Sequence, residues 1–228
     1  DGQVSTAMPM CREEDLPYFF HQLEEYFAEV LHKPFYIALA DEEAVQYLGL
    51  DPKEYEVEEQ VDLKDYLYDG EAMRTLAGKK LHKKKNHLNA FMREYEGRYE
   101  YRRLCCSDRH EVWEFMERWR QKKADADALE DSLEYEVAGI HEILKNCSSL
   151  SVRMAAVYVD GQMEAFTIGS LNERENMAVI HIEKANPDIK GLYQFINQQF
   201  LVHEFPDVAL VNREDDVGME GLRKAKMS

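Results

Sequence analysis

The chain lacks any long apolar run, and it has few of the residues that interrupt regular structure. Its 228 residues include only 11 Gly and 6 Pro, which excludes a collagen-like chain and is atypical of a disordered, low-complexity one. No stretch approaches the ~20 consecutive apolar residues that a membrane-spanning helix needs, so we expect no transmembrane segment. With 45% hydrophobic residues the chain can bury a core, and its length allows one large domain or two small ones.

Cysteine is also scarce. The chain has four cysteines, Cys11, Cys105, Cys106 and Cys147, which form no C-x-x-C pair and have no metal-ligand spacing with the eight histidines. We therefore expect no metal site, and we expect reduced, structural thiols in a cytoplasmic protein.

Basic residues are outnumbered, with 28 Lys and Arg against 45 Asp and Glu, for a formal net charge of −17. Evenly spread, this charge would repel nucleic acid and anionic lipid. It is not evenly spread, because residues 1–75 carry −14, residues 76–103 carry +6 and residues 104–228 carry −9. The pattern predicts two acidic bodies, residues 1–70 and 98–228, joined by a basic helical connector over residues 71–97.

The first acidic body reads as part of an α/β domain. Apolar residues recur at three- and four-residue steps over residues 13–31, which predicts an amphipathic helix. Residues 35–40 read as a short strand, and Asp41 is a candidate N-cap for a brief helix that Gly49 ends. One or two more strands are expected over residues 55–67. Because such an apolar helix needs a sheet to cover, we expect the beginning of this domain to be missing.

The connector reads as helical over residues 71–95, with Gly78 as a weak point. In the second body, Asp160-Gly161 supplies the positive φ angles of a tight hairpin turn. A loop is expected over residues 122–132. The remaining elements are expected as strands at 98–102, 154–159, 162–168, 177–182 and 208–211, and helices around 112–119, 133–144 and 192–200. This order is typical of a GCN5-related acyltransferase fold.

The connector also carries candidate ligand-binding residues. Five lysines fall within seven residues, and amide and imidazole groups interleave with them. Ammonium groups beside such donors suit an anionic or phosphate-bearing small molecule, and the junction of two bodies is a common place for a ligand. A solvated helix face is the equal alternative. The candidates are Lys79, Lys80, Lys83, Lys84, Lys85, Asn86, His87 and Asn89.

Two further candidate groups lie at the ends of late strands. Alternation places His181 and Glu183 on one strand face, where they could transfer protons; a satisfied core histidine and an exposed strand end are the alternative. Asn212, Arg213 and Glu214 come after the next strand, where open sheets present ligand-contacting groups, and an ordinary acidic turn is the alternative there.

Several long segments resemble a known family. Residues 78–91, 181–185, 196–200 and 211–226 are similar to the largely uncharacterised bacterial family grouped with the C-terminal domain of phosphatidylglycerol lysyltransferase. More remotely, the chain resembles the Fem peptidoglycan aminoacyltransferases, which have two GCN5-related domains in tandem and a basic helix between them. The resemblance implies transfer of an acyl or aminoacyl group, in the relatives from aminoacyl-tRNA, to an amine or hydroxyl. It also implies a role for Lys226, which matches a lysine of Fem-like proteins, and for the basic connector at Lys83, Lys85 and Asn86. Lys224 is a further candidate for substrate binding.

The resemblance leaves the donor open. Residues 186–191 hold one Gly, one Lys and an Asp, where acetyl-CoA-using relatives have a Gly-rich, basic turn for pyrophosphate. An ordinary acetyl-CoA donor is therefore in doubt, and both aminoacyl-tRNA and acyl-CoA are considered as donors.

We thus predict a mixed α/β (α+β) protein with tandem GCN5-related acyltransferase-like domains, in which helices flank mixed sheets, the first domain is incomplete and the second lacks its last strands. The predicted function is transfer of an acyl or aminoacyl group to an amine or hydroxyl of an anionic acceptor, with His181, Glu183 and Lys226 as catalytic residues. The alternative is a non-catalytic module that senses a phosphorylated metabolite or RNA.

Overall fold

The structure is a computed structural model that describes residues 4–124 and 130–227. It divides into two compact units, Asp1–Glu59 and Gln60–Ser228, each described here by itself. The expected boundary at residue 70 lies inside the second unit. In the part of the chain that is described, no helix is long and apolar enough to cross a membrane.

The first unit is a small helix-and-strand assembly. Helix α1 (Leu16–Glu25) continues into a π-helical turn over Tyr26–Leu31 and buries Leu16, Phe20 and Phe27. Two short strands, β1 (Thr6–Ala7) and β2 (Ile37–Leu39), pair in parallel. Helix α2 (Glu42–Leu48) begins as its caps predict, because the Asp41 side chain accepts a 2.7 Å hydrogen bond from the Ala44 amide, and it ends at Gly49 with φ +57°.

A six-stranded mixed sheet forms the centre of the second unit, in the order β3-β8-β7-β6-β5-β4. Its β7 and β8 pair in parallel and every other neighbouring pair is antiparallel. The strands are β3 (Leu67–Asp69), β4 (Tyr99–Leu104), β5 (Val152–Val159), β6 (Gln162–Asn172), β7 (Met177–Ala185) and β8 (Leu210–Asn212). The hairpin expected at Asp160-Gly161 is confirmed, with φ of +52° and +81°. Of the strands expected over residues 55–67, only the edge strand β3 forms, and it starts at their last residue.

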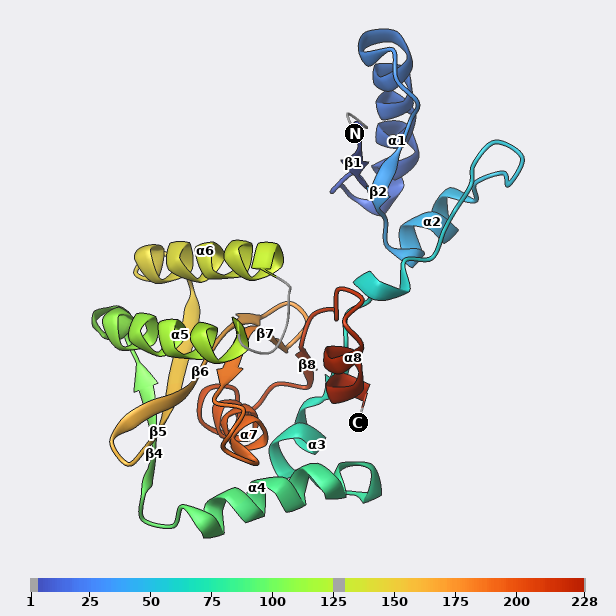
Figure 1. Cartoon of the computed structure of the whole chain (residues 1–228). Coiled ribbons are helices and arrows are strands. Elements are labelled where there is room, and N and C mark those ends of the chain that lie inside the picture. The colour runs from blue at the N-terminus through green and yellow to red at the C-terminus, as the bar shows by residue number, and fades with distance from the viewer. Residues whose placement is uncertain (1–3, 125–129, 228) are drawn as a thin grey trace. The chain divides into compact units, whose positions relative to one another are not determined.

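Helices cover both faces of this sheet (Figure 1). On one face, α5 (Arg109–Ala124) and α6 (Glu130–Asn146) pack on a core that includes Ile168 and Ile182. On the other, α7 (Leu192–Glu204) packs against α3 (Gly70–Thr75) and α4 (His82–Glu94). A last helix, α8, spans Glu220–Met227. The fold class is therefore confirmed as mixed α/β, with helices flanking a mixed sheet. Of the loop expected over residues 122–132, positions 125–129 lie outside the described residues.

The connector is helical in two pieces, α3 and α4, and the chain breaks between them around Gly78, the weak point expected from the sequence. The chain leaves the helical conformation at Leu76 (φ +48°) and Gly78 (φ +93°), makes a 3-10 turn at Lys79–Leu81 and only then begins α4. Leu76 is buried in the same cluster as Leu88 of α4, so apolar packing stabilises the unusual backbone that separates α3 from α4.

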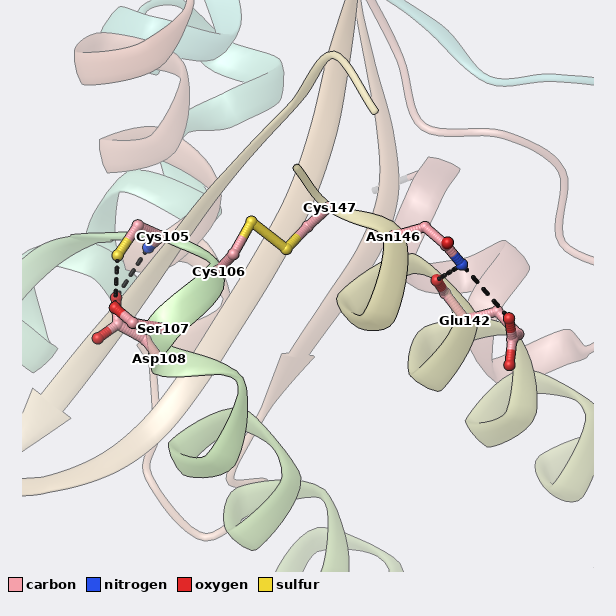
Figure 2. The surroundings of a disulfide bond; sticks show 7 residues. All are labelled: Cys105, Cys106, Ser107, Asp108, Glu142, Asn146 and Cys147. Carbon is pink, nitrogen blue, oxygen red and sulfur yellow. Dashed lines mark hydrogen bonds between the residues drawn. A yellow bond between two sulfur atoms is a disulfide. The ribbon is translucent and has the colours of Figure 1, made fainter. Parts of the chain in front are cut away.

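Two of the four thiols are joined. A disulfide links Cys106, in the 3-10 turn before α5, to Cys147, directly after α6, as Figure 2 shows. The expectation of reduced thiols is therefore wrong for this pair, whose Cα atoms lie 5.9 Å apart although 41 positions separate them in the sequence. Cys11 and Cys105 are free and exposed.

Candidate functional site

The candidate site lies where β7 and β8 separate. The two strands pair over three residues, Met177–Val179 with Leu210–Asn212, and β7 then continues to Ala185 without β8 opposite it. Because the strands run in the same direction, the last residues of β7 and the residues that follow β8 lie at the same end of the sheet. We call the polar residues gathered there the β7–β8 site: Lys84, Ser170, His181, Glu183, Arg213 and Glu214.

His181 forms a hydrogen-bonded row with two other side chains of the site. Its Nδ1 lies 2.8 Å from Oε1 of Glu214, and its Nε2 lies 2.8 Å from Oγ of Ser170. An ionised carboxylate can only accept, so Nδ1 carries a proton and donates to Glu214. In the neutral imidazole Nε2 then accepts from the Ser170 hydroxyl. The side chains of His181 and Glu214 are 32% and 44% exposed, so a solute can reach the row.

A β-bulge gives His181 this position. Ile168 of β6 pairs with Ile182, and Gly169 pairs with Ile180, so His181 is the extra residue of β7. Bulges redirect side chains, which is why strict alternation fails here. His181 contacts Ser170, which shares a face of β6 with the core residue Ile168.

Glu183 points the other way, toward α7. Its Oε1 accepts a 2.8 Å hydrogen bond from Arg213, and its Oε2 accepts a 2.6 Å bond from Asn197 of α7. The Glu183 and Arg213 side chains are 8% and 17% exposed, so the ion pair is largely desolvated. The prediction that His181 and Glu183 share one face is therefore wrong, although Arg213 and Glu214, adjacent in sequence, bring the two groups to one end of the sheet.

Lys84 is the connector lysine that reaches this site. Its Nζ is buried and has no hydrogen-bond partner among the described residues, and it lies 5.8 Å from the centroid of the Tyr68 ring. Burial, followed by the charge of Arg213, lowers the pKa of Lys84 below its ordinary value, and Glu183 acts in the opposite direction. Two cations therefore stand near one anion, so this part of the site is suited to a negatively charged ligand group.

Lys226 holds the backbone that carries Arg213 and Glu214. Its ammonium donates to the carbonyl oxygens of Arg213 at 2.6 Å, Glu214 at 3.2 Å and Asp215. The side chain is 7% exposed, and burial lowers its pKa, followed by the charge of Arg213. All three donors of the ammonium group are thus engaged by the chain itself.

The segment after β8 is held by further polar contacts. Asn212 donates to Asp65 at 2.6 Å and accepts the Glu214 amide at 2.6 Å, which fixes the turn that presents Glu214. Asp216 accepts 2.7 Å and 2.8 Å bonds from Arg223 and a 2.6 Å bond from Tyr66. These bonds, Arg223 first, hold the pKa of Asp216 well below its usual range and raise that of Arg223.

The other predicted site residues do not join this cluster. His87 is half-buried on α4, and the rest are exposed: Lys79, Lys80, Lys83, Lys85, Asn86, Asn89 and Lys224. Lys79 and Lys85 border an open hollow of about 590 Å³ together with Leu76, Ala77, Gly78 and His82. Across the described part of the chain, no three His, Cys, Asp or Glu residues are arranged to hold a metal ion.

Sequence reasoning missed Ser170, Asn197 and Tyr68. A lone serine near a strand end and a lone asparagine on an apolar helix give no local signal. The inward position of Lys84 did have one, because Lys84, Leu88 and Phe91 follow the i, i+4, i+7 spacing of one helix face, and the latter two are buried.

Three solved structures are similar to this chain over most of its length. Over the full length of this chain, a conserved protein of unknown function from Bacteroides thetaiotaomicron superposes with a TM-score of 0.86 and 27% identity, and 75% of that protein is covered. The C-terminal domain (DUF2156) of a putative lysylphosphatidylglycerol synthetase from Agrobacterium fabrum gives a TM-score of 0.60 at 18% identity, over 92% of this chain and 63% of that one. L-PGS from Bacillus licheniformis gives 0.58 at 12% identity, over 94% and 65%.

The sequence is also similar to a curated protein and matches a family model. An uncharacterised protein of Mycoplasmoides gallisepticum is 29% identical over 165 residues, which are 72% of this chain and 51% of that protein, so the alignment spans about half the length of this curated relative. The family model described as "Phosphatidylglycerol lysyltransferase, C-terminal" matches residues 1–228, so the match begins further toward the N-terminus than the resembling segments, the first of which starts at residue 78. The chain belongs to the phosphatidylglycerol lysyltransferase C-terminal family.

Proposed function

We propose that the β7–β8 site transfers an aminoacyl group from an ester donor to a hydroxyl or amine of an anionic acceptor. The family name supports lysine as the transferred group and phosphatidylglycerol, an anionic lipid with free hydroxyls, as the acceptor class. The site supports an anionic ligand through Lys84 and Arg213, and it has a proton acceptor, His181, at the same end of the sheet.

The observation that carries the proposal is the pair of cations formed by Lys84 and Arg213. Leaving an ammonium group buried without a hydrogen-bond partner is costly, and proteins retain such groups mainly where a ligand uses them. Arg213 already forms an ion pair with Glu183 at 2.8 Å, so Lys84 supplies the positive charge that has no partner in the described part of the chain. In this proposal Glu183 and Asn197 position Arg213, and Lys84 and Arg213 bind the phosphate of the acceptor.

His181 supplies the proton acceptor. Transfer from an ester requires that a hydroxyl or amine lose its proton as it attacks the carbonyl carbon. Glu214 orients the imidazole through Nδ1 and leaves Nε2 able to accept that proton. Lys226 acts by fixing the backbone of residues 213–215, so we assign it a positioning role in place of the catalytic role expected from its sequence match.

The packing of α4 favours aminoacyl-tRNA over acyl-CoA as the donor. A Cβ atom built on Gly191, which precedes α7, would lie 2.1 Å from the carbonyl oxygen of His87 and 3.0 Å from Cβ of Phe91. The end of the turn over residues 186–191, which stands where acetyl-CoA-using relatives bind pyrophosphate, thus packs directly against α4. The exposed lysines of the connector offer a surface for a polyanionic donor.

The proposal is tested by transfer of radiolabelled lysine from lysyl-tRNA to phosphatidylglycerol vesicles. Lys84→Ala should lower transfer at least about tenfold, which corresponds to the ~1.4 kcal/mol or more expected for loss of a charged hydrogen bond. Arg93→Ala is the matched control, because Arg93 is an exposed cation on the same helix, and it should leave transfer unchanged. Equal activity of Lys84→Ala and the wild type would contradict the proposal. Saturable binding of RNA or a phosphorylated metabolite without any turnover would instead favour the sensor function.

A further inference from the structure

Ser170 occupies the position of a nucleophile in the row that it forms with His181 and Glu214. Its Oγ lies 2.8 Å from Nε2 of His181, and Nδ1 of the same ring lies 2.8 Å from the Glu214 carboxylate. A serine, a histidine and a carboxylate that contact one another in this way form a catalytic triad. Such a triad is identified by its geometry, not by the order of its residues along the chain. The three residues come from three separate segments: Ser170 from β6, His181 from the bulge of β7 and Glu214 from the turn after β8. No local sequence pattern therefore predicts this row.

The direction of each hydrogen bond fits activation of the serine. The ionised Glu214 accepts from Nδ1, which leaves Nε2 as the only ring nitrogen that can take a proton. In the neutral imidazole with its proton on Nδ1, the group that donates to Nε2 is the Ser170 hydroxyl, 2.8 Å away. Asn212 fixes the Glu214 amide at 2.6 Å, and Lys226 fixes the Glu214 carbonyl at 3.2 Å, so the carboxylate is held on a fixed turn.

The row is also accessible. Ser170 is half-buried, and His181 keeps about a third of its side-chain surface in solvent. A serine used only to satisfy a core histidine would be expected among apolar neighbours on all sides, whereas this pair contacts Glu214, whose side chain is 44% exposed.

We infer that Ser170 is a nucleophile and that the chain takes up the acyl group of an activated ester covalently on Ser170 Oγ. The Ser170 proton moves to His181 Nε2 as the Oγ–carbonyl bond forms. The ester C–O bond then breaks, and the leaving alcohol receives that proton. In the second half-reaction an acceptor hydroxyl, or water, gives its proton to His181 and attacks the acyl carbon. The Oγ–carbon bond breaks and Ser170 recovers its proton, so the two half-reactions balance without any redox partner.

This inference deepens the proposed function, because it assigns a covalent route to the same site, but its test uses neither tRNA nor lipid. The probes are a fluorophosphonate, which labels activated serines, and p-nitrophenyl acetate, which reports acyl uptake as a burst of nitrophenolate. We expect one fluorophosphonate per chain on the peptide that contains Ser170, and a burst close to one equivalent.

Matched variants separate nucleophilic from structural roles. Ser170→Ala and His181→Ala should abolish both signals, Glu214→Gln should slow them about 10- to 100-fold, and Ser170→Cys should restore acyl uptake. Ser149→Ala, at an exposed serine outside the site, should label like the wild type. Absence of label on the wild type, or label that persists in Ser170→Ala, would overturn the inference. Lysyl transfer without labelling would leave the proposed function standing as a direct transfer, and labelling without lysyl transfer would identify an esterase.

Discussion

Replacement of Lys226 by methionine should destabilise the second unit strongly. The substitution removes three hydrogen bonds from an ammonium group to the carbonyl oxygens of Arg213, Glu214 and Asp215, and it leaves those oxygens without this donor. A hydrogen bond to a charged group contributes about 1.5–3 kcal/mol. Methionine avoids the cost of burying a charge, which offsets part of the loss, so we expect the free energy of unfolding to fall by about 3 kcal/mol.

The assay is urea unfolding followed by tryptophan fluorescence. Both tryptophans, Trp113 and Trp119, lie in α5, so the signal reports the second unit alone. A loss of about 3 kcal/mol should lower the urea midpoint by roughly 1–2 M and the Tm by about 6–12 °C. Lys224→Met is the control, because Lys224 is exposed on the same helix, and its midpoint should match the wild type. If Lys226→Met kept the wild-type midpoint and lost only turnover, the positioning role would be refuted and a catalytic role supported.

Three further predictions concern the same unit. The pKa of Lys84 is lowered in the folded state, so near pH 10 the unfolded chain binds more protons on this residue than the folded chain does. The stability of the wild type relative to Lys84→Met should therefore rise as the pH approaches 10.5. Urea unfolding at a series of pH values measures this difference. The pKa of Asp216 is also lowered in the folded state, so its contribution to stability is present above about pH 4 and is lost as the pH falls further. Between pH 5 and pH 2 the urea midpoint of Asp216→Asn should therefore change less than that of the wild type. An equally steep fall in the two midpoints would contradict the ion pair with Arg223. Gly191→Ala places a Cβ atom 2.1 Å from a carbonyl of α4 at φ +86° and should cost about 3 kcal/mol or more, whereas Gly139→Ala, in α6 with open space around it, should stabilise by about 0.5–1 kcal/mol in the same thermal melt.

Elements fixed by local chemistry were predictable from the sequence. Asp41 and Gly49 delimit α2, and Asp160-Gly161 turns the hairpin, because capping and positive φ depend on a few adjacent residues. The break at Leu76 was not predictable, since a leucine adopts a positive φ only where tertiary packing stabilises it.

The candidate site was only partly predictable, because its geometry depends on contacts between distant segments. His181 and Glu183 were identified, but the bulge that turns them to different faces arises from the pairing of β6 with β7. Ser170 becomes a candidate only through its contact with His181, 11 positions later in the sequence, and through the contact of His181 with Glu214, a further 33 positions later. The basic connector was predicted as a source of site residues, and helix phase singles out Lys84 among its neighbours. The spacing of Lys84 to Leu88 and Phe91 was the usable signal.

The most direct test of the anion site is an NMR titration of Lys84 itself. In protein labelled with ¹³C-lysine, the ε-methylene signal that disappears in Lys84→Met is followed against pH, with and without glycerol 3-phosphate. An anion beside Lys84 favours its charged form, so we predict that glycerol 3-phosphate shifts this signal saturably and raises the pKa of Lys84 from its lowered value, while the signals of exposed lysines barely respond. An unchanged Lys84 signal and an unchanged pKa at saturating glycerol 3-phosphate would contradict the account.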